Sequence, residues 1–161
     1  MEIRNKVRGI AHDLDVAKIT VVGVPDHPGI AAGIFVPLAE AGISIDTIVQ
    51  NASVENITDL SFTVARSQLK KAMAVVEPIA TSINARQCVA DSGLGKISII
   101  GTGMQNAPGY AARMFDTLSK AGVNIQLITT SEIRITCIIE ESSLKDALRA
   151  LHRTFELDTE K

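Results

Sequence analysis

The hydrophobic and polar positions of this chain form one pattern that occurs twice. The stretch from Ile19 to Asn51 is matched by the stretch from Ile97 to Thr130. Each copy begins with an apolar run that ends in Gly, passes through a loop that closes on Pro-Gly, and continues as an amphipathic stretch that ends in Ala-Gly. A period of roughly 80 residues is too long for a solenoid repeat. The pattern therefore predicts two copies of one small domain.

In the first copy, the pattern predicts six elements in the order strand, helix, strand, strand, helix, strand. The expected ranges are a strand over 18–24, a helix over 28–41, strands over 43–54 and 57–65, a helix from Ser67, and a strand over 84–91. Pro37 lies inside the first helix and predicts a bend near Val36. This element order is typical of the ferredoxin-like βαββαβ unit, an α+β fold whose antiparallel sheet carries both helices on one face.

The second copy repeats this order but ends without a fourth strand. Its expected elements are a strand over 96–101, a helix over 108–121, strands over 125–130 and 133–140, and a helix over 142–155. The N-terminal segment Asn5 to His12 has no place in the first copy, so we expect it to supply the missing strand. Domain one, 16–92, would then be inserted between the two parts of domain two, 1–15 and 93–161, and the two would unfold together.

Composition and charge exclude several classes of partner. The net charge is -2 with both signs scattered, aromatic residues make up 3%, and Trp is absent, so nucleic acid is not an expected partner. No window has the 18 or so apolar residues of a membrane span, and the N-terminus lacks a signal-peptide stretch, so we expect a cytoplasmic protein without a membrane partner. Cys88 and Cys137 lie in apolar strand-like runs without metal-site spacing, and we expect free, buried thiols.

No catalytic constellation is visible in the sequence. The three histidines, His12, His27 and His152, lie in separate elements and match no metal or triad spacing. The Gly101-Thr102-Gly103 step lacks a third Gly, since Asn106 stands in its place, and no phosphate-binding loop occurs. We therefore predict no catalytic residue, no metal and no cofactor.

The two Pro-Gly loops are better candidates for chemistry. Each places a helix N-terminus directly after a strand, where the amides of Gly29 to Ala31 or of Gly109 to Ala111 can bind a small carboxylate. Asp26, Gln50 and Asn51 can accept hydrogen bonds from an ammonium group. An amino acid fits both requirements. The alternative is that Pro28-Gly29 is only a helix start and that Asp26 is only its cap.

At these residues the sequence resembles the ACT domain, a small-molecule regulatory module, and in particular the paired ACT domains of aspartokinases. The resemblance is carried by VVGVPDHPGIAA, AGISIDTIVQNAS, SIIGTGMQNAPGYAARMF and GVNIQLITTSEIRITCII. It implies the regulatory β subunit of an α2β2 aspartokinase, or the same fragment of a full-length enzyme, forming a homodimer and partnering the catalytic α subunit. It also implies feedback inhibition by L-threonine, and possibly L-lysine, of the enzyme that serves lysine, threonine and methionine biosynthesis.

The resemblance also implies an effector site. The threonine pocket of the family corresponds to Asp26, Gly29, Ile30, Ala31, Gln50, Asn124 and Ile125. A further effector surface corresponds to Ser44, Ile45, Asp46, Tyr110, Ala111 and Ser131. The second loop is longer and lacks an equivalent of Asp26, so we expect non-equivalent sites, with the second loop mainly a lid for the first. Two other hypotheses are an assembly module that senses nothing and, less favoured, a catalyst.

Overall fold

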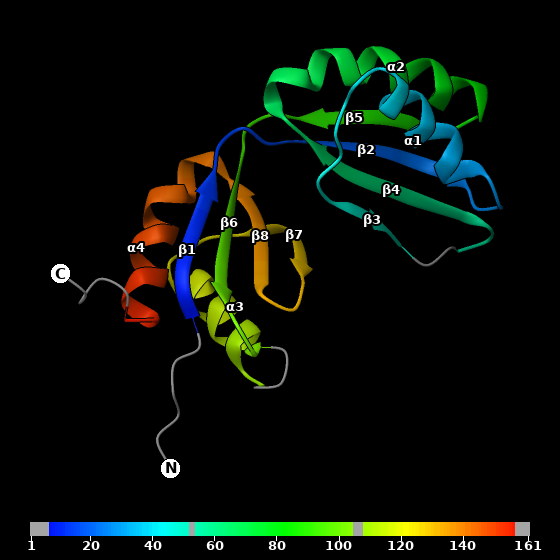
Figure 1. The fold of residues 1–161 in the computed structure, drawn as a ribbon. Coiled ribbons are helices and arrows are strands. Elements are labelled where there is room, and N and C mark those ends of the chain that lie inside the picture. The colour runs from blue at the N-terminus through cyan, green and yellow to red at the C-terminus, as the bar shows by residue number, and fades with distance from the viewer. Residues whose placement is uncertain (1–6, 52–53, 105–107, 157–161) are drawn as a thin grey trace. The chain divides into compact units, whose positions relative to one another are not determined.

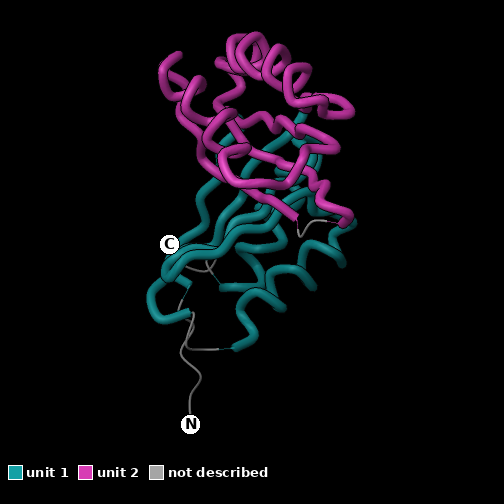
Figure 2. The backbone as a smooth tube through the Cα atoms, turned by 90° about the vertical axis from the view of Figure 1, so that its right-hand side faces the viewer, with its two compact units in different colours: residues 1–14, 93–161 teal, residues 15–92 magenta. Residues whose placement is uncertain are grey.

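The chain folds into two compact units (Figure 2). The computed structural model describes residues 7–51, 54–104 and 108–156. Unit 1 comprises residues 1–14 and 93–161, and unit 2 comprises residues 15–92.

Unit 2 has the predicted ferredoxin-like arrangement. Its elements are β2 (Ala17–Pro25), α1 (Ile30–Glu40), β3 (Ile48–Gln50), β4 (Ile57–Val64), a 3-10 turn (Arg66–Gln68), α2 (Leu69–Ser82) and β5 (Gln87–Asp91). The strands form an antiparallel sheet in the order β3-β4-β2-β5. Both helices cover the same face of this sheet (Figure 1).

The period of two in the strands and the helical period in α1 and α2 direct the apolar residues of unit 2 to one core. The fully buried side chains include Ile19, Phe62, Ile34 and Leu38. The ring of Phe35 meets the ring of Phe62 edge-on, with 5.2 Å between centroids, a favourable geometry for an aromatic pair.

Unit 1 completes its sheet with the N-terminal segment. Its elements are β1 (Val7–Asp13), β6 (Leu94–Gly101), α3 (Tyr110–Lys120), β7 (Ile125–Thr130), β8 (Arg134–Glu140), a 3-10 turn (Glu141–Ser143) and α4 (Leu144–Thr154). The order is β1-β6-β8-β7, and β1 pairs antiparallel with β6 through Ile10 and Ile99. The prediction that this segment supplies the missing strand is confirmed; Asn5 and Lys6 lie outside the described residues.

The core of unit 1 is closed by the C-terminal end of α4. Phe155 is fully buried among Met114, Leu118 and neighbouring side chains. The guanidinium of Arg113 lies 4.8 Å from the centre of the Phe155 ring and donates a hydrogen bond of 2.8 Å to the carbonyl of Thr154. A cation near the last carbonyls of a helix stabilises its C-terminus.

The second strand of the first copy is shorter than predicted. The sequence predicts a strand over 43–54, whereas β3 covers only Ile48–Gln50. Before β3, the Asp46 amide donates to the Thr63 carbonyl at 3.1 Å and the Thr63 amide donates to the Thr47 carbonyl at 2.9 Å, while the Thr47 amide donates to the Thr63 hydroxyl at 3.1 Å. Pairing thus continues before Ile48, but in an irregular pattern that lies outside the strand. Of the predicted helices, α1 runs through Pro37 and α2 runs through Pro78. The bend near Val36 stays a prediction.

The two thiols are free, as predicted, but only Cys137 is buried. Burial raises the pKa of Cys137 to about 12. Cys88 is half-buried because it lies on the edge strand β5, where no further strand in the described part of unit 2 covers it. Burial, with a smaller contribution from Glu77, raises the pKa of this thiol too. The expectation of two buried thiols is therefore wrong for Cys88.

Candidate functional site

A cavity of about 400 Å³ lies in unit 2 between the β2–α1 loop, the first turn of α1 and the β3–β4 hairpin. We call it the first cavity. It is lined by Val24, Asp26, His27, Pro28, Gly29, Ile30, Ala31, Ala32, Gln50, Thr58 and Leu60. The structure thus brings together five of the predicted site residues, Asp26, Gly29, Ile30, Ala31 and Gln50.

Gly29 sets the direction in which α1 begins. Its φ is 95°, in the left-handed region that favours glycine. The Gly33 amide donates to the Gly29 carbonyl at 2.9 Å, and the Ile30 amide donates to the His27 carbonyl at a longer 3.3 Å. The first-turn amides of a helix have no acceptor within the helix and carry partial positive charge. The N-terminus of α1 therefore gives the first cavity an anion-binding edge.

Asp26 supplies the opposite charge at the same cavity. Its backbone amide donates to the Asn56 carbonyl at 2.8 Å, and its Oδ1 accepts from Gln50 Nε2 at a long 3.4 Å. Neither bond caps α1, because the helix start has no side-chain cap in the described part of the chain. The interpretation of Asp26 as a helix cap is therefore wrong, and its carboxylate lies exposed at the rim of the first cavity.

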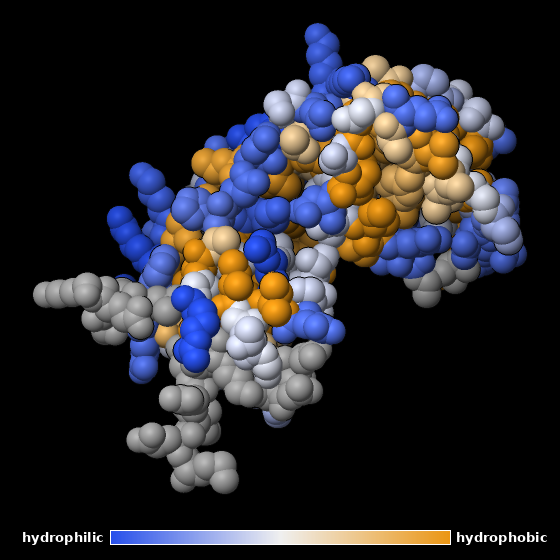
Figure 3. Space-filling model, in the orientation of Figure 1, coloured by the Kyte–Doolittle hydropathy of each residue, from blue (hydrophilic) through white to orange (hydrophobic). Residues whose placement is uncertain are grey.

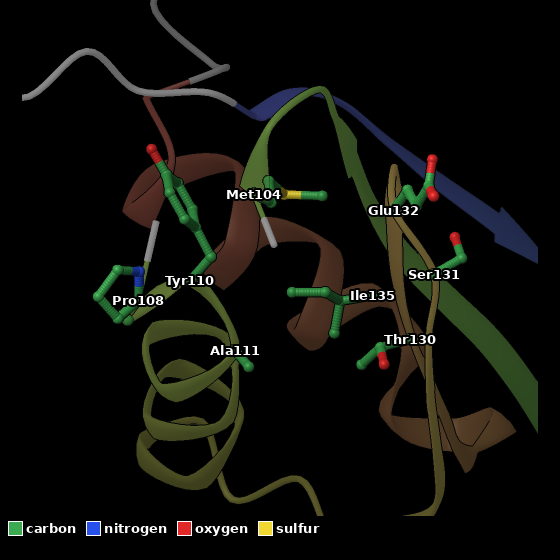
Figure 4. A pocket seen from close by; sticks show the side chains of 9 residues that line it. Met104, Pro108, Tyr110, Ala111, Thr130, Ser131, Glu132 and Ile135 are labelled. Atoms are coloured by element: carbon green, nitrogen blue, oxygen red, sulfur yellow. The ribbon is translucent and has the colours of Figure 1, made fainter. Parts of the chain in front are cut away.

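A second cavity, of about 500 Å³, occupies the equivalent place in unit 1. It lies between the start of α3 and the β7–β8 hairpin, and Met104 and Ile135 reach into the space between them (Figure 4). It is lined by Met104, Pro108, Gly109, Tyr110, Ala111, Thr130, Ser131, Glu132 and Ile135. Gly109 repeats the geometry of Gly29 with a φ of 104°.

The two cavities differ in chemistry. The two loops differ in length, and they are matched here from the Gly that ends the apolar run, Gly23 or Gly101. On this count, Met104, buried at 5% exposure, stands in unit 1 where unit 2 has Asp26. Tyr110 replaces Ile30 and stacks on Phe155 with 6.5 Å between ring centroids. The acidic group of the second cavity is Glu132, which comes from the hairpin rather than from the loop. The second loop therefore has a cavity of its own, and its role as a lid stays a prediction.

The remaining predicted site residues lie elsewhere. Asn51 follows β3, and its carbonyl accepts from the Thr58 hydroxyl at 2.6 Å. Ser44, Ile45 and Asp46 lie between α1 and β3 in unit 2, where the Asp46 amide donates to the Thr63 carbonyl at 3.1 Å. Asn124 and Ile125 lie at the start of β7 in unit 1, in a shallow depression with Phe115.

Several lining residues were not predicted from the sequence. Thr58 and Leu60 reach the first cavity because β4 pairs with β2, in a register that places Thr58 opposite Val24. His27 lies in the same loop as Asp26, and its Nδ1 is 3.1 Å from the Pro28 carbonyl, so this nitrogen carries the proton. The Pro-Gly motif could have pointed to His27, which lies directly before it. No sequence motif indicates the register of β4, so nothing pointed to Thr58 and Leu60.

Within the described ranges, the structure shows neither a group of metal ligands nor a membrane-spanning helix. No group of three or more His, Cys, Asp or Glu side chains gathers there in a way that could hold a metal ion. None of the helices described has both the length and the apolar character needed to cross a bilayer.

Comparison with known proteins gives consistent matches. A sequence profile of the ACT domain matches residues 19–78 and 97–155. An aspartate kinase of Stutzerimonas stutzeri is 46% identical over 152 residues, which are 94% of this chain but 37% of that protein. The chain thus spans little more than a third of the length of the curated relatives it matches.

Two solved structures match nearly end to end. The ligand-free regulatory subunit of aspartate kinase from Thermus thermophilus has a TM-score of 0.89 and 39% identity, over 93% of this chain and 99% of that one. A structure of aspartokinase alpha and beta subunits gives a TM-score of 0.87 and 41% identity with the same coverage.

Proposed function

This chain belongs to the ACT domain family, as the regulatory ACT-domain region of an aspartokinase, and from that membership we propose that it binds L-threonine as a feedback inhibitor. The observation that carries the proposal is the first cavity, which joins a helix N-terminus to an exposed carboxylate. An α-amino acid presents the complementary pair of charges.

The two charged ends of the amino acid have separate places. Its carboxylate would accept hydrogen bonds from the first-turn amides of α1. Its ammonium would donate to the Asp26 carboxylate and to the side-chain carbonyl of Gln50. The long hydrogen bond of 3.4 Å between these two side chains can be exchanged for stronger charge-assisted bonds to the ligand.

The walls of the first cavity favour threonine over lysine. Val24, Leu60 and Ile30 offer apolar surface to a methyl group, and the Thr58 hydroxyl offers a polar partner. Lysine needs a second acid for its distal ammonium, and among the described residues that line this cavity Asp26 is the one acid. Glu132 makes the second cavity the better place for lysine, should the protein bind it.

We further propose that the chain forms a homodimer through α1 and the β3 edge. The outer face of α1 is apolar, with Val36 52% exposed, and the edge residue Ile48 is 53% exposed. The equivalent face of α3 carries Arg113 and Asp116 where α1 has Gly33 and Val36. Apolar side chains gather where α1 runs on the surface of unit 2 (Figure 3). Such a face is typical of a covered surface.

In the dimer, the first cavity of one copy would be completed by Asn124 and Ile125 of the second copy. This arrangement follows the family pattern and would place a threonine at the seam between two chains. Because threonine would then bind the dimer better than the monomer, it would stabilise the dimer by mass action.

Replacement of Val36 by glutamate tests this interface. A charge on the outer face of α1 is expected to shift the chain to monomer and to remove the stabilisation of the dimer by threonine, measured by sedimentation velocity with and without the amino acid. Val89→Glu is the matched control, since Val89 is 45% exposed on β5 at the opposite edge of the same sheet. Dimers that survive Val36→Glu, or dissociate equally with Val89→Glu, would contradict the interface.

In the cell, we propose, the chain acts in the cytoplasm with the catalytic part of aspartokinase, either as a separate β subunit in an α2β2 assembly or as part of one long chain. Threonine would then control the phosphorylation of aspartate in lysine, threonine and methionine biosynthesis. A ligand shifts the equilibrium between two states of a kinase only if the ligand binds one state more tightly than the other. If no amino acid changes dimer stability, the function is instead that of an assembly module.

A further inference from the structure

The hairpin that borders the first cavity is longer than its counterpart in unit 1. Nine residues, 51–59, separate Gln50 from its ladder partner Leu60, whereas four, 131–134, separate Thr130 from its partner Ile135. The two hairpins otherwise occupy the same place in the two sheets. Unit 2 therefore carries an extension that the fold itself does not require.

This extension is tied to the loop that carries Asp26. The Asn56 carbonyl, at the tip, accepts from the Asp26 amide at 2.8 Å and so continues the β2–β4 ladder beyond Pro25. Asp59 Oδ1 accepts from the Gly23 amide at 2.9 Å. In unit 1 the corresponding turn meets the end of β6, where the Gly101 amide donates to the Ile133 carbonyl at 2.8 Å.

The turn at the tip has a demanding backbone conformation. Glu55 and Asn56 both have positive φ, 55° and 63°, and the flanking Val54 and Ile57 exchange two backbone hydrogen bonds of 3.0 and 3.1 Å. Two central residues with positive φ define a type I′ hairpin turn, which favours Asn and Gly at these positions. The direction of the Asn56 carbonyl therefore depends on a residue that tolerates the left-handed region.

We infer that the extended β3–β4 hairpin is a clamp that holds Asp26 in place for the ammonium group of the effector, with Asn56 as a positioning residue. The inference rests on the proposed function of the first cavity. Asn56 itself does not line that cavity. Its backbone conformation aims the carbonyl that fixes Asp26, and through it the carboxylate.

Substitution of Asn56 by valine tests the clamp, because a β-branched side chain is strained at a φ of 63°. The turn would rearrange and release the Asp26 amide, and we expect threonine affinity to fall about fivefold, the effect of losing one hydrogen bond. Asn56→Gly keeps the left-handed turn and should keep wild-type affinity. Calorimetric titration with threonine and a thermal melt would be recorded for each variant.

Asn84 provides a matched control. It has a φ of 59°, lies in unit 2 after α2, and does not line the first cavity. Asn84→Val should lower the melting temperature as Asn56→Val does and leave affinity unchanged. Equal affinity for wild type and Asn56→Val, or equal losses in both valine variants, would overturn the clamp. If valine prevents folding, the less strained Asn56→Ala and Asn84→Ala pair gives the same comparison. A wild-type chain that binds no threonine would overturn the proposed function itself.

Discussion

Replacing Asp26 with alanine is expected to weaken threonine binding by about 10- to 100-fold, since a hydrogen bond to a charged group contributes roughly 1.5–3 kcal/mol. The variant loses the carboxylate that, under the proposed function, accepts from the ligand ammonium. Its fold should survive, because Asp26 is exposed and its backbone bond to the Asn56 carbonyl does not involve the side chain. Titration calorimetry gives the affinity, and circular dichroism reports the fold.

Asp116→Ala is the control for this substitution. Asp116 is a carboxylate on α3 with a 63% exposed side chain, and it pairs with Lys120 at 2.9 Å. Its removal changes the net charge by the same amount as the removal of Asp26, and threonine affinity should remain at the wild-type value. If Asp26→Ala binds threonine as wild type does, the ligand ammonium is not held at this carboxylate and the assignment of the first cavity fails.

Replacing Phe62 with alanine should destabilise unit 2 by roughly 3–5 kcal/mol, the usual effect of truncating a buried aromatic side chain. Phe62 is fully buried and loses its edge-on contact with Phe35 as well. Val89→Ala, at an exposed position of the same sheet, should change the free energy of unfolding by less than about 0.5 kcal/mol. Urea unfolding followed by circular dichroism measures both variants.

The same experiment shows whether the two units unfold together. Tyr110 is the single tyrosine of the chain and lies buried in unit 1, so its fluorescence reports that unit. Because unit 2 is inserted between β1 and β6, its unfolding would leave those paired strands joined by a long loop, at an entropic cost. We expect Phe62→Ala to lower the midpoint seen by Tyr110 too. An unchanged Tyr110 midpoint would mean that the units are independent.

The repeat in the sequence predicted the fold well because the elements of one copy could be matched one by one to the elements of the other. The second copy lacked one strand, and the segment around Ile10 was the one apolar stretch without a place, so the pairing of β1 with β6 followed. The extent of β3 could not be predicted in this way. Its apolar residues continue before Ile48, but both Asp46 and Thr47 donate their amides to Thr63, one to its carbonyl and one to its hydroxyl, so the regular ladder begins only at Ile48.

The candidate site was predicted in part for a similar reason. Asp26, Gly29 and Gln50 belong to short motifs whose local conformations bring them to one end of a sheet, and they line one cavity. Thr58 depends instead on the register between β2 and β4, and the Asn56 carbonyl depends on the length and turn type of a hairpin. Neither feature is encoded in a local pattern of apolar and polar residues.

The divergence of the two copies gives the chain two chemically unlike cavities. Unit 2 combines an acidic loop with an apolar outer helix face, whereas unit 1 combines an apolar loop at Met104 with a charged face on α3. A helix start after a left-handed glycine is common to both. Under the proposed function, this shared backbone would hold the ligand carboxylate, and the side chains around it would determine which amino acid fits.

Calorimetric titration of the purified chain with L-threonine, followed by L-lysine and L-methionine, tests the central claim most directly. Threonine should bind saturably, with one molecule per chain if the first cavity alone is occupied and two if the second also takes it. Such binding, weakened about 10- to 100-fold in Asp26→Ala, would establish the chain as an effector-binding regulatory region. Baseline heats for all three amino acids would contradict the claim and favour a module that assembles kinase subunits without sensing an effector.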